Sequence, residues 1–341
     1  MKKLKNNKDF LFKNFDISLL FNITNDSYTM RDLDNVFTIF KSLEDLLYLV
    51  YSTKKKSIIS FNLNKFQIIT EIKGAHPRFI TNLKHFFDKN NNKDFIMSIS
   101  SDNCNIKIWD HKNWNCILNI HDIYSKGIIN SASFIAYQNN IYIVASNNFW
   151  PNADSIKIIN LGGGVIKKIN NSEENSYYID SYEDKSDCNL YIISCSYYYV
   201  ISYNYIKNEI YHKYCDNNSK YHCSWKIYEK QGIIRLIESA SDGIIRIWNF
   251  HSGSLLKRIY VSNLCIYGLY LEDDENIFVG CSDNCIKLIN INSGMIIKNI
   301  VGCKNWVLSI NKINHEKYGN CLISQGIKDE QIKLWKIKKI E

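Results

Sequence analysis

The chain contains 341 residues, of which 45% are hydrophobic and 22% charged, and its formal net charge is +8. This composition excludes a disordered polyelectrolyte, and the length accommodates two ordinary domains or one large all-β domain. The 11 cysteines include no CxxC pair, the 2 prolines mark no linker, and no apolar run approaches about 18 residues, so neither a disulfide scaffold nor a membrane helix is expected.

The first predicted strand is the segment FDISLLFNI, residues 15–23. After it, apolar residues alternate with a period of two almost throughout the chain, which is the pattern of half-buried β-strands. Seven of these strands align with one another: residues 57–63, 105–111, 155–161, 199–205, 244–250, 285–291 and 331–337. Each contains a large anchor residue, and the anchors recur every 41 to 50 residues: Phe61, Trp109, Ile159, Tyr203, Trp248, Ile289 and Trp335. A phrase that recurs in this way marks one structural unit used several times.

The fifth unit shows what surrounds each anchor strand. It reads as four short strands, residues 222–230, 234–241, 244–250 and 254–260, with Asp242-Gly243 as a strong hairpin signal. The sixth unit repeats the arrangement at residues 265–271, 276–282, 285–291 and 295–301. Four strands with a period near 45 residues match one blade of a β-propeller.

The repeated phrase resembles the WD-repeat family over almost the whole chain. The Trp-Asp pair occurs once, as Trp109-Asp110, and Trp248-Asn249 and Trp335-Lys336 are close variants. The resemblance implies an all-β fold, a seven-bladed β-propeller of four-stranded antiparallel blades, as a single domain over residues 1–341. We expect the blades at roughly 34–73, 78–121, 128–170, 177–215, 222–260, 265–302 and 306–337.

The last unit lacks its fourth strand. Its strands at 306–313, 320–326 and 331–337 bring the sequence to its end, whereas segment 15–23 has no partner. WD-repeat propellers commonly close by adding an N-terminal strand to the final blade, so we expect segment 15–23 to complete it. Closure removes two bare strand edges that an open ring would expose.

The resemblance also implies a structural hydrogen-bonded set of His, Ser or Thr, Asp and Trp within a blade. The matching residues are His222, Ser239, Asp242 and Trp248 in the fifth blade and His76, Ser98, Asp102 and Trp109 in the second. The sixth blade retains Asp283, and the seventh retains Ser324, Asp329 and Trp335. We assign all of them a structural role.

No enzyme motif is found: GxSxG, HExxH and the phosphate-binding P-loop are absent from the sequence. His212, Cys215, His222 and Cys223 have metal-ligand chemistry, but the adjacent His222 and Cys223 would point to opposite faces of a strand. We therefore expect no catalytic residue, no cofactor and no metal. A propeller enzyme remains an alternative that would require acid, His or metal-ligand side chains clustered in the central channel.

Aromatic residues on predicted loops are the candidate partner-binding residues: Phe149, Trp150, Tyr197, Tyr198, Trp225 and Trp306. Aromatic side chains held by a rigid ring are typical interface anchors. The alternative for Trp150 is that it folds back onto its own blade.

Lysine outnumbers arginine strongly, with only five arginines in the sequence, which does not favour specific nucleic-acid readout. If the ring closes as expected, however, lysines from both ends of the chain form one basic edge: Lys2, Lys3, Lys5, Lys8, Lys336, Lys338 and Lys339. Such an edge could attract an acidic protein tail or RNA.

We interpret the chain as a non-catalytic scaffold, a monomeric propeller that binds other proteins within a larger complex. Two alternatives stay open. One is a substrate receptor of a cullin-type ubiquitin ligase, because WDHK at 109–112 approaches the Trp-Asp-x-Arg signature with Lys112 in place of Arg. The other is a subunit of an RNA-associated complex. No signal peptide follows the basic N-terminus, so an intracellular location, in the cytoplasm or the nucleus, is expected.

Overall fold

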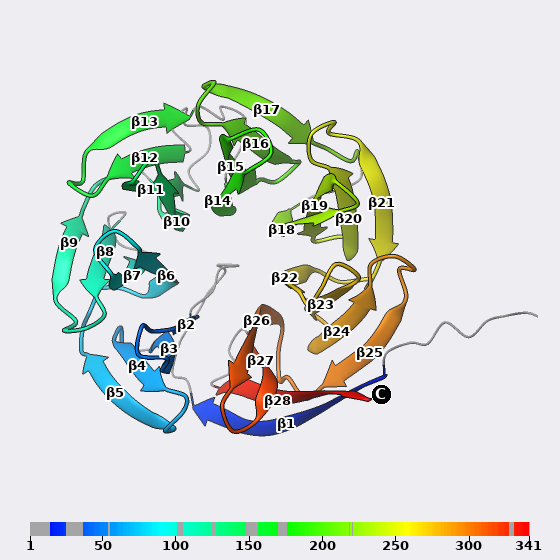
Figure 1. The fold of residues 1–341 in the computed structure, drawn as a ribbon, viewed down its shortest axis with the longest axis horizontal. Coiled ribbons are helices and arrows are strands. Elements are labelled where there is room, and N and C mark those ends of the chain that lie inside the picture. The colour runs from blue at the N-terminus through cyan, green and yellow to red at the C-terminus, as the bar shows by residue number, and fades with distance from the viewer. Residues whose placement is uncertain are drawn as a thin grey trace, which may run out of the picture.

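The computed structural model describes residues 14–24, 37–53, 55–100, 105–124, 127–147, 156–169, 176–217, 219, 221–326 and 331–340. These residues form seven four-stranded antiparallel sheets arranged around a central axis (Figure 1). The predicted seven-bladed β-propeller is confirmed. In the described ranges, no segment forms the long apolar helix that would be needed to cross a membrane.

The strands of the first four blades, from the channel outward, have the following bounds. They are β2 (Phe37–Lys41), β3 (Leu47–Ser52), β4 (Ile58–Asn62) and β5 (Gln67–Ile72); β6 (Ile80–Asp88), β7 (Lys93–Ser100), β8 (Asn105–Asp110) and β9 (Cys116–Ile120); β10 (Ile129–Tyr137), β11 (Asn140–Asn147), β12 (Ile156–Asn160) and β13 (Val165–Ile169); and β14 (Tyr178–Asp184), β15 (Asn189–Cys195), β16 (Val200–Asn204) and β17 (Glu209–Tyr214).

The remaining three blades follow the same order. They are β18 (His222–Lys230), β19 (Ile233–Ala240), β20 (Ile244–Asn249) and β21 (Leu255–Tyr260); β22 (Ile266–Leu271), β23 (Asn276–Cys281), β24 (Cys285–Asn290) and β25 (Ile296–Val301); and β26 (Val307–His315), β27 (Gly319–Gly326), β28 (Gln331–Ile340) and the N-terminal β1 (Asn14–Thr24).

The hydrophobic core lies between neighbouring blades. One cluster packs Ile237 and Ile247 of the fifth blade against Ile277 and Val279 of the sixth. The alternating pattern explains this packing, because each strand presents one set of apolar residues to the preceding blade and the other set to the following one. The rim strands differ: most side chains of β5 are exposed, since no sheet covers them.

The ring closes through the pairing of the first and last strands. β1 runs antiparallel to β28, with Ile17 opposite Ile337 and Leu19 opposite Trp335. In Figure 1 the two strands lie side by side at the rim of the last blade. Ile17 also packs against the apolar cluster that contains Trp335 and Ile337. The predicted use of segment 15–23 as the closing strand is consistent with this sheet, in which β1 spans Asn14–Thr24.

We predict that removing residues 1–24 lowers the free energy of unfolding by several kcal/mol, because β28 loses a ladder of hydrogen bonds and its apolar cover, at about 25 cal/mol per Å² of buried apolar surface. Urea unfolding of the truncated and full chains measures the difference. The control removes residues 1–13 only. Equal unfolding midpoints for the two truncated chains would contradict closure by β1.

Candidate interaction face and the polar cluster beneath it

The propeller has two faces, which carry different sets of loops and turns. Because successive strands alternate in direction, the loops between blades and the turns between second and third strands open on one side, which we name the loop face. The turns between first and second strands and between third and fourth strands open on the other side, the hairpin face. Loops carry most recognition in rigid scaffolds, so the loop face is the candidate interaction face.

Four tyrosines of the fourth and fifth blades form a contiguous group on the loop face: Tyr177, Tyr197, Tyr198 and Tyr221, which we name the tyrosine surface. The ring centroids of Tyr197 lie 4.5 Å from Tyr198 and 4.3 Å from Tyr221, in both cases edge to face. Tyr177 lies 5.6 Å from Tyr221. Tyr198 is 52% and Tyr221 44% exposed, so this surface presents aromatic area to solvent.

Backbone hydrogen bonds hold the tyrosine surface in place. The amide of Tyr221 donates to the carbonyl of Tyr197 at 2.7 Å, and the amide of Ser241 donates to the carbonyl of Tyr221 at 3.0 Å. Three loops are therefore joined at Tyr221. This tyrosine has a φ of 51°, a left-handed conformation that is uncommon for a bulky residue and persists only where the surroundings enforce it.

The other predicted partner-binding residues have different positions. Trp306 is 42% exposed and stacks on Tyr267 with ring centroids 5.7 Å apart. Trp225 is only 6% exposed, so its prediction as a surface anchor is wrong. It lies within β18 rather than on the preceding loop, and it packs edge to face on Tyr178 in the core between the fourth and fifth blades. Phe149 and Trp150 lie outside the described residues.

The structural hydrogen bonds implied by the resemblance are present in the second blade. His76 Nε2 lies 2.7 Å from Ser98 Oγ, and Trp109 Nε1 donates to the same oxygen at 2.8 Å. In the seventh blade Trp335 Nε1 donates to Ser324 Oγ at 2.8 Å. In the sixth, Asp283 pairs with Lys287 at 2.6 Å. Asp102 and Asp329 lie outside the described residues.

The fifth blade departs from this scheme, and the expected contact of Ser239 with His222 and Trp248 is wrong. Ser98 and Ser324 lie opposite Lys107 and Lys333 in the strand register, whereas the residue opposite Arg246 is Glu238. Ser239 is one position further along β19, and a shift of one residue turns a side chain to the other face. His222 Nδ1 instead bonds Glu238 Oε2 at 2.7 Å, and Trp248 Nε1 has no hydrogen-bond partner among the described residues.

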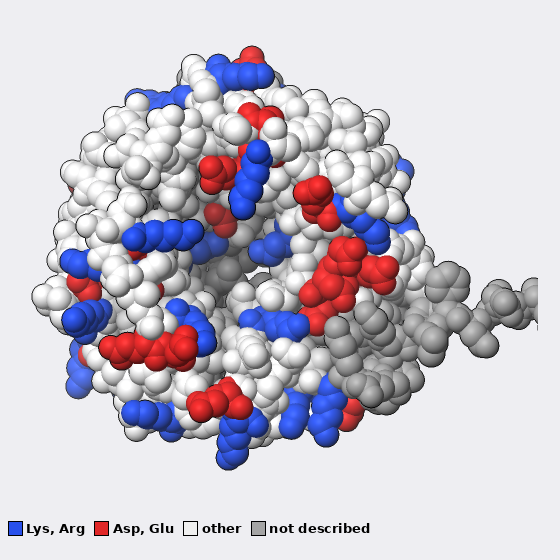
Figure 2. Space-filling model, in the orientation of Figure 1, with Lys and Arg blue, Asp and Glu red and all other residues white. Residues whose placement is uncertain are grey.

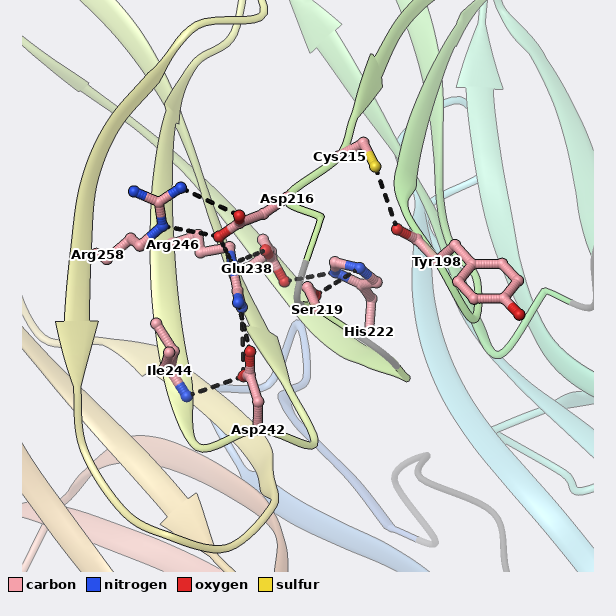
Figure 3. Close-up of polar contacts among 10 residues, drawn as sticks. All are labelled: Tyr198, Cys215, Asp216, Ser219, His222, Glu238, Asp242, Ile244, Arg246 and Arg258. Atoms are coloured by element: carbon pink, nitrogen blue, oxygen red, sulfur yellow. Dashed lines mark hydrogen bonds and ion pairs between the residues drawn. The ribbon is translucent and has the colours of Figure 1, made fainter.

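Glu238 belongs to a polar group that we name the Arg246 cluster (Figure 3): Asp216, Ser219, His222, Glu238, Asp242, Arg246 and Arg258. The Arg246 side chain is fully buried, and its Nε donates to Asp216 at 2.7 Å. Its two terminal nitrogens donate to the carboxylate of Asp242. Arg258, on the rim strand β21, donates to both carboxylate oxygens of Asp216, at 2.8 and 3.0 Å. The cluster thus links all four strands of the fifth blade to the preceding loop.

Equivalent positions in other blades use a simpler contact. The positions that correspond to Arg246 in the second, third and sixth blades hold Lys107, Lys157 and Lys287. Their ammonium groups donate to loop carbonyls at 2.7 to 3.0 Å. Arginine offers a planar group with five donors, so it can bind several carboxylates at once where lysine acts as a single charge. The loop before the fifth blade, which carries Tyr221, is therefore held by charged side chains as well as by its backbone.

The charges of the Arg246 cluster shift the titration of its members. The hydrogen bonds of Arg258 and Arg246 lower the pKa of Asp216 to about 2. Burial disfavours the charged form of His222, but the Glu238 carboxylate outweighs that effect and raises the pKa of His222 above its ordinary value.

We predict that stability falls at mildly alkaline pH through His222. Because its pKa is raised on folding, its stabilising contribution is complete below about pH 6.5 and is lost as the pH rises through the folded-state pKa. Urea unfolding between about pH 6 and 9 should show this loss in the wild type and a flatter profile in His222→Gln. The exposed His121→Gln variant is the control. If the free energy of unfolding of His222→Gln falls with pH as steeply as that of the wild type, the pH dependence does not come from His222.

We predict that Arg246→Met destabilises the fold by about 3–5 kcal/mol, because it leaves buried carboxylates without their cation. Denaturant titration measures the cost. Arg235→Met, in β19 with its guanidinium over the ring of Tyr228, is the matched control and should cost less. Similar costs for the two variants would show that the cluster adds nothing beyond ordinary packing.

The hairpin face holds the WDHK segment and a cavity. A cavity of about 400 Å³ between the first and second blades is lined by Asp110, His111 and Lys112, together with Tyr48 and Trp114. Burial lowers the pKa of His111 to about 4, so this imidazole is neutral near pH 7. Lys112 is exposed at this site, and its part in a cullin-type receptor stays a prediction.

The four residues with metal-ligand chemistry that the sequence brings together do not share one partner in the described structure. Each of the four candidate metal ligands has a different hydrogen-bond partner: His212 bonds the carbonyl of His251, Cys215 that of Tyr198, Cys223 that of Tyr221, and His222 the carboxylate of Glu238.

The basic edge lies only partly within the described residues. On β28, Lys336 lies opposite Ser18, Lys338 opposite Asp16 and Lys339 opposite Phe15 of β1. Lys2, Lys3, Lys5 and Lys8 lie outside the described residues.

Charges on the ring are mixed in sign. Figure 2 shows Lys and Arg side chains interspersed with Asp and Glu on one face and around the mouth of the channel. On the innermost strands, Lys84 of β6 pairs with Asp180 of β14 at 3.5 Å, and Lys312 of β26 pairs with Glu272, which follows β22 of the adjacent blade, at 2.6 Å. Among the described residues, these channel groups are therefore engaged as ion pairs.

The seven four-stranded blades, with the N-terminal strand in the last one, define the fold as a seven-bladed β-propeller, and its repeated Trp-containing strands resemble those of WD-repeat proteins. The WD repeat domain-containing protein 83 homolog of Dictyostelium discoideum is 29% identical over 103 residues, 30% of each chain. The U3 small nucleolar RNA-associated protein 21 homolog of Schizosaccharomyces pombe is 23% identical over 100 residues, 29% of this chain and 11% of that protein. Less than a third of either relative is therefore matched. No family model matches the chain.

Proposed function

We propose that the protein is a non-catalytic scaffold subunit of an intracellular complex and that it binds a partner protein through the tyrosine surface. The observation that carries the proposal is the group of four contiguous tyrosines on loops that the Arg246 cluster and backbone bonds hold in place. Tyrosine, tryptophan and arginine are enriched at energetic centres of interfaces, and a rigid support lowers the entropic cost of binding.

The position of the tyrosine surface supports the same function. It spans the loops of two adjacent blades, so a partner seated there would contact both. Trp306 and Tyr267 offer a second aromatic group on the loop face, between the sixth and seventh blades. A ring with separated contact points suits the simultaneous docking of several proteins, which gains affinity through effective concentration.

We predict that Tyr198→Ala and Tyr221→Ala each weaken partner binding by about 30-fold, equivalent to about 2 kcal/mol. Affinity purification with quantitative mass spectrometry identifies the partner, and calorimetry with the purified partner measures the change. Tyr260→Ala is the control, because Tyr260 is 60% exposed on the rim strand β21.

Unchanged binding in both tyrosine variants would place the interface elsewhere. A loss of binding accompanied by a lower melting temperature would assign the tyrosines to the fold. The expected result is weaker binding at an unchanged melting temperature, because Tyr198 is half exposed and contributes little buried area.

A second candidate function is membership of an RNA-associated complex, in the nucleus. The observation that favours it is the printed name of one relative, which associates that protein with U3 small nucleolar RNA. The basic edge is the candidate contact. If it binds RNA, affinity must fall steeply between about 50 and 200 mM salt, and the substitution of Lys336, Lys338 and Lys339 by Gln must reduce the salt dependence. Salt-independent binding would exclude this edge.

A further inference from the structure

We propose that Asp184, Asp187 and His251 bind a zinc ion on the hairpin face, at the junction of the fourth and fifth blades. Each residue offers one donor atom, and the three donor atoms lie within 4.8 Å of one another. Asp184 ends β14 and Asp187 lies in the turn that follows, whereas His251 lies in the turn between β20 and β21. An ion at this position would join two neighbouring blades on the side opposite the tyrosine surface.

The buried carboxylate of Asp184 gives the first reason for a cation. Its side chain is 1% exposed, and its Oδ1 accepts from the amide and hydroxyl of Ser186 at 2.8 and 2.7 Å. Its Oδ2 is buried and forms no hydrogen bond among the described residues. A buried carboxylate oxygen that accepts no hydrogen bond is costly, and a bound cation would satisfy it more fully than the 3.1 Å ion contact with His251 Nε2.

The position of that oxygen relative to His251 gives the second reason. Asp184 Oδ2 lies 3.1 Å from His251 Nε2, yet the contact does not have hydrogen-bond geometry. Zinc bonds nitrogen and carboxylate oxygen at about 2.0–2.2 Å, which places neighbouring ligand atoms roughly 3 Å or slightly more apart. The two atoms are therefore spaced as ligands of one ion.

The surroundings of His251 prepare its Nε2 for a metal. Its Nδ1 lies 3.1 Å from the hydroxyl of Tyr211, and its backbone carbonyl accepts from His212 Nε2 at 2.5 Å. A metal-bound histidine usually donates its other ring N–H to a polar partner, which fixes the tautomer and the ring orientation. Donation from Nδ1 to the Tyr211 oxygen leaves the Nε2 lone pair directed toward the carboxylates.

Asp187 supplies the accessible ligand. It is exposed, its Oδ1 accepts from the amide of Asn189 at 2.9 Å, and its Oδ2 accepts from the hydroxyl of Tyr191 at 2.7 Å. A small rotation of this side chain closes the donor set around an ion, and water completes the coordination. One imidazole with two carboxylates suits zinc, whereas calcium and magnesium prefer oxygen ligands alone.

The test is calorimetric titration of the chelator-treated full chain with zinc alone. We expect one site, and we expect His251→Gln and Asp187→Asn each to weaken zinc binding at least 10-fold. His121→Gln and Asp273→Asn are matched controls, since His121 is exposed on another blade and Asp273 caps the equivalent turn of the sixth blade. Both controls should bind zinc like the wild type.

Two further measurements separate the proposal from simpler explanations. The exposed Cys188 is adjacent to Asp187 and is therefore a competing candidate ligand. If Asp184, Asp187 and His251 bind the ion without it, the cobalt-substituted protein should show no thiolate charge-transfer band, and Cys188→Ser should retain zinc affinity. Zinc should raise the melting temperature of the wild type and leave that of Asp187→Asn nearly unchanged.

The proposal is overturned if zinc does not bind, if binding survives His251→Gln or Asp187→Asn, or if it depends on Cys188. It is also overturned if His251→Gln lowers the melting temperature without any effect of zinc on the wild type, because His251 and Asp184 would then serve only to hold the blades together.

Discussion

Ring closure by the β1–β28 pair is the constraint on which the rest of this structure depends. Every other blade is made from consecutive strands, but the last one joins residues from opposite ends of the described chain. The core lies between blades, so each blade is stabilised only when both neighbours are present. A break at the closing blade would expose two apolar sheet faces as well as a strand edge, and the loops on both faces would lose their fixed spacing.

Within the closed ring, the junction of the fourth and fifth blades differs chemically from the others. In the second, third and sixth blades a lysine of the third strand donates to a loop carbonyl, but here a buried arginine binds two carboxylates at short range and lies near a third. Such a cluster fixes geometry more than it adds net stability, because burying charges costs much of what their attraction returns. The same junction carries the tyrosine surface on one face and the Asp184, Asp187 and His251 group on the other.

The blade count, the four-stranded pattern and the closing strand could be predicted from the sequence, because the period-two pattern and the spacing of anchors such as Trp109 and Trp335 reflect backbone geometry. The candidate site could be predicted only in part. Tyr197 and Tyr198 follow a strand directly, so their loop position could be inferred, but the contribution of Tyr221 depends on contacts between loops distant in sequence.

The errors have the same physical origin. The place of Trp225 near the start of a strand predicts a surface position, but whether such a residue points inward depends on a register that the sequence does not display. The role of Glu238 is not evident from the sequence, because serine holds the corresponding position in the second and seventh blades. The spacing of 10 residues from Glu238 to Trp248, against 11 from Ser98 to Trp109, shifts the equivalent position by one.

Closure by the first and last strands also imposes an order on folding during synthesis. β1 emerges from the ribosome first, but its partner β28 begins at Gln331, more than 300 residues later. At about 5–20 residues per second, β1 waits tens of seconds without its native neighbour. An apolar strand with a free edge is a template for incorrect pairing during that interval. The architecture that completes the last blade with the N-terminal strand therefore makes the growing chain dependent on protection until β28 appears.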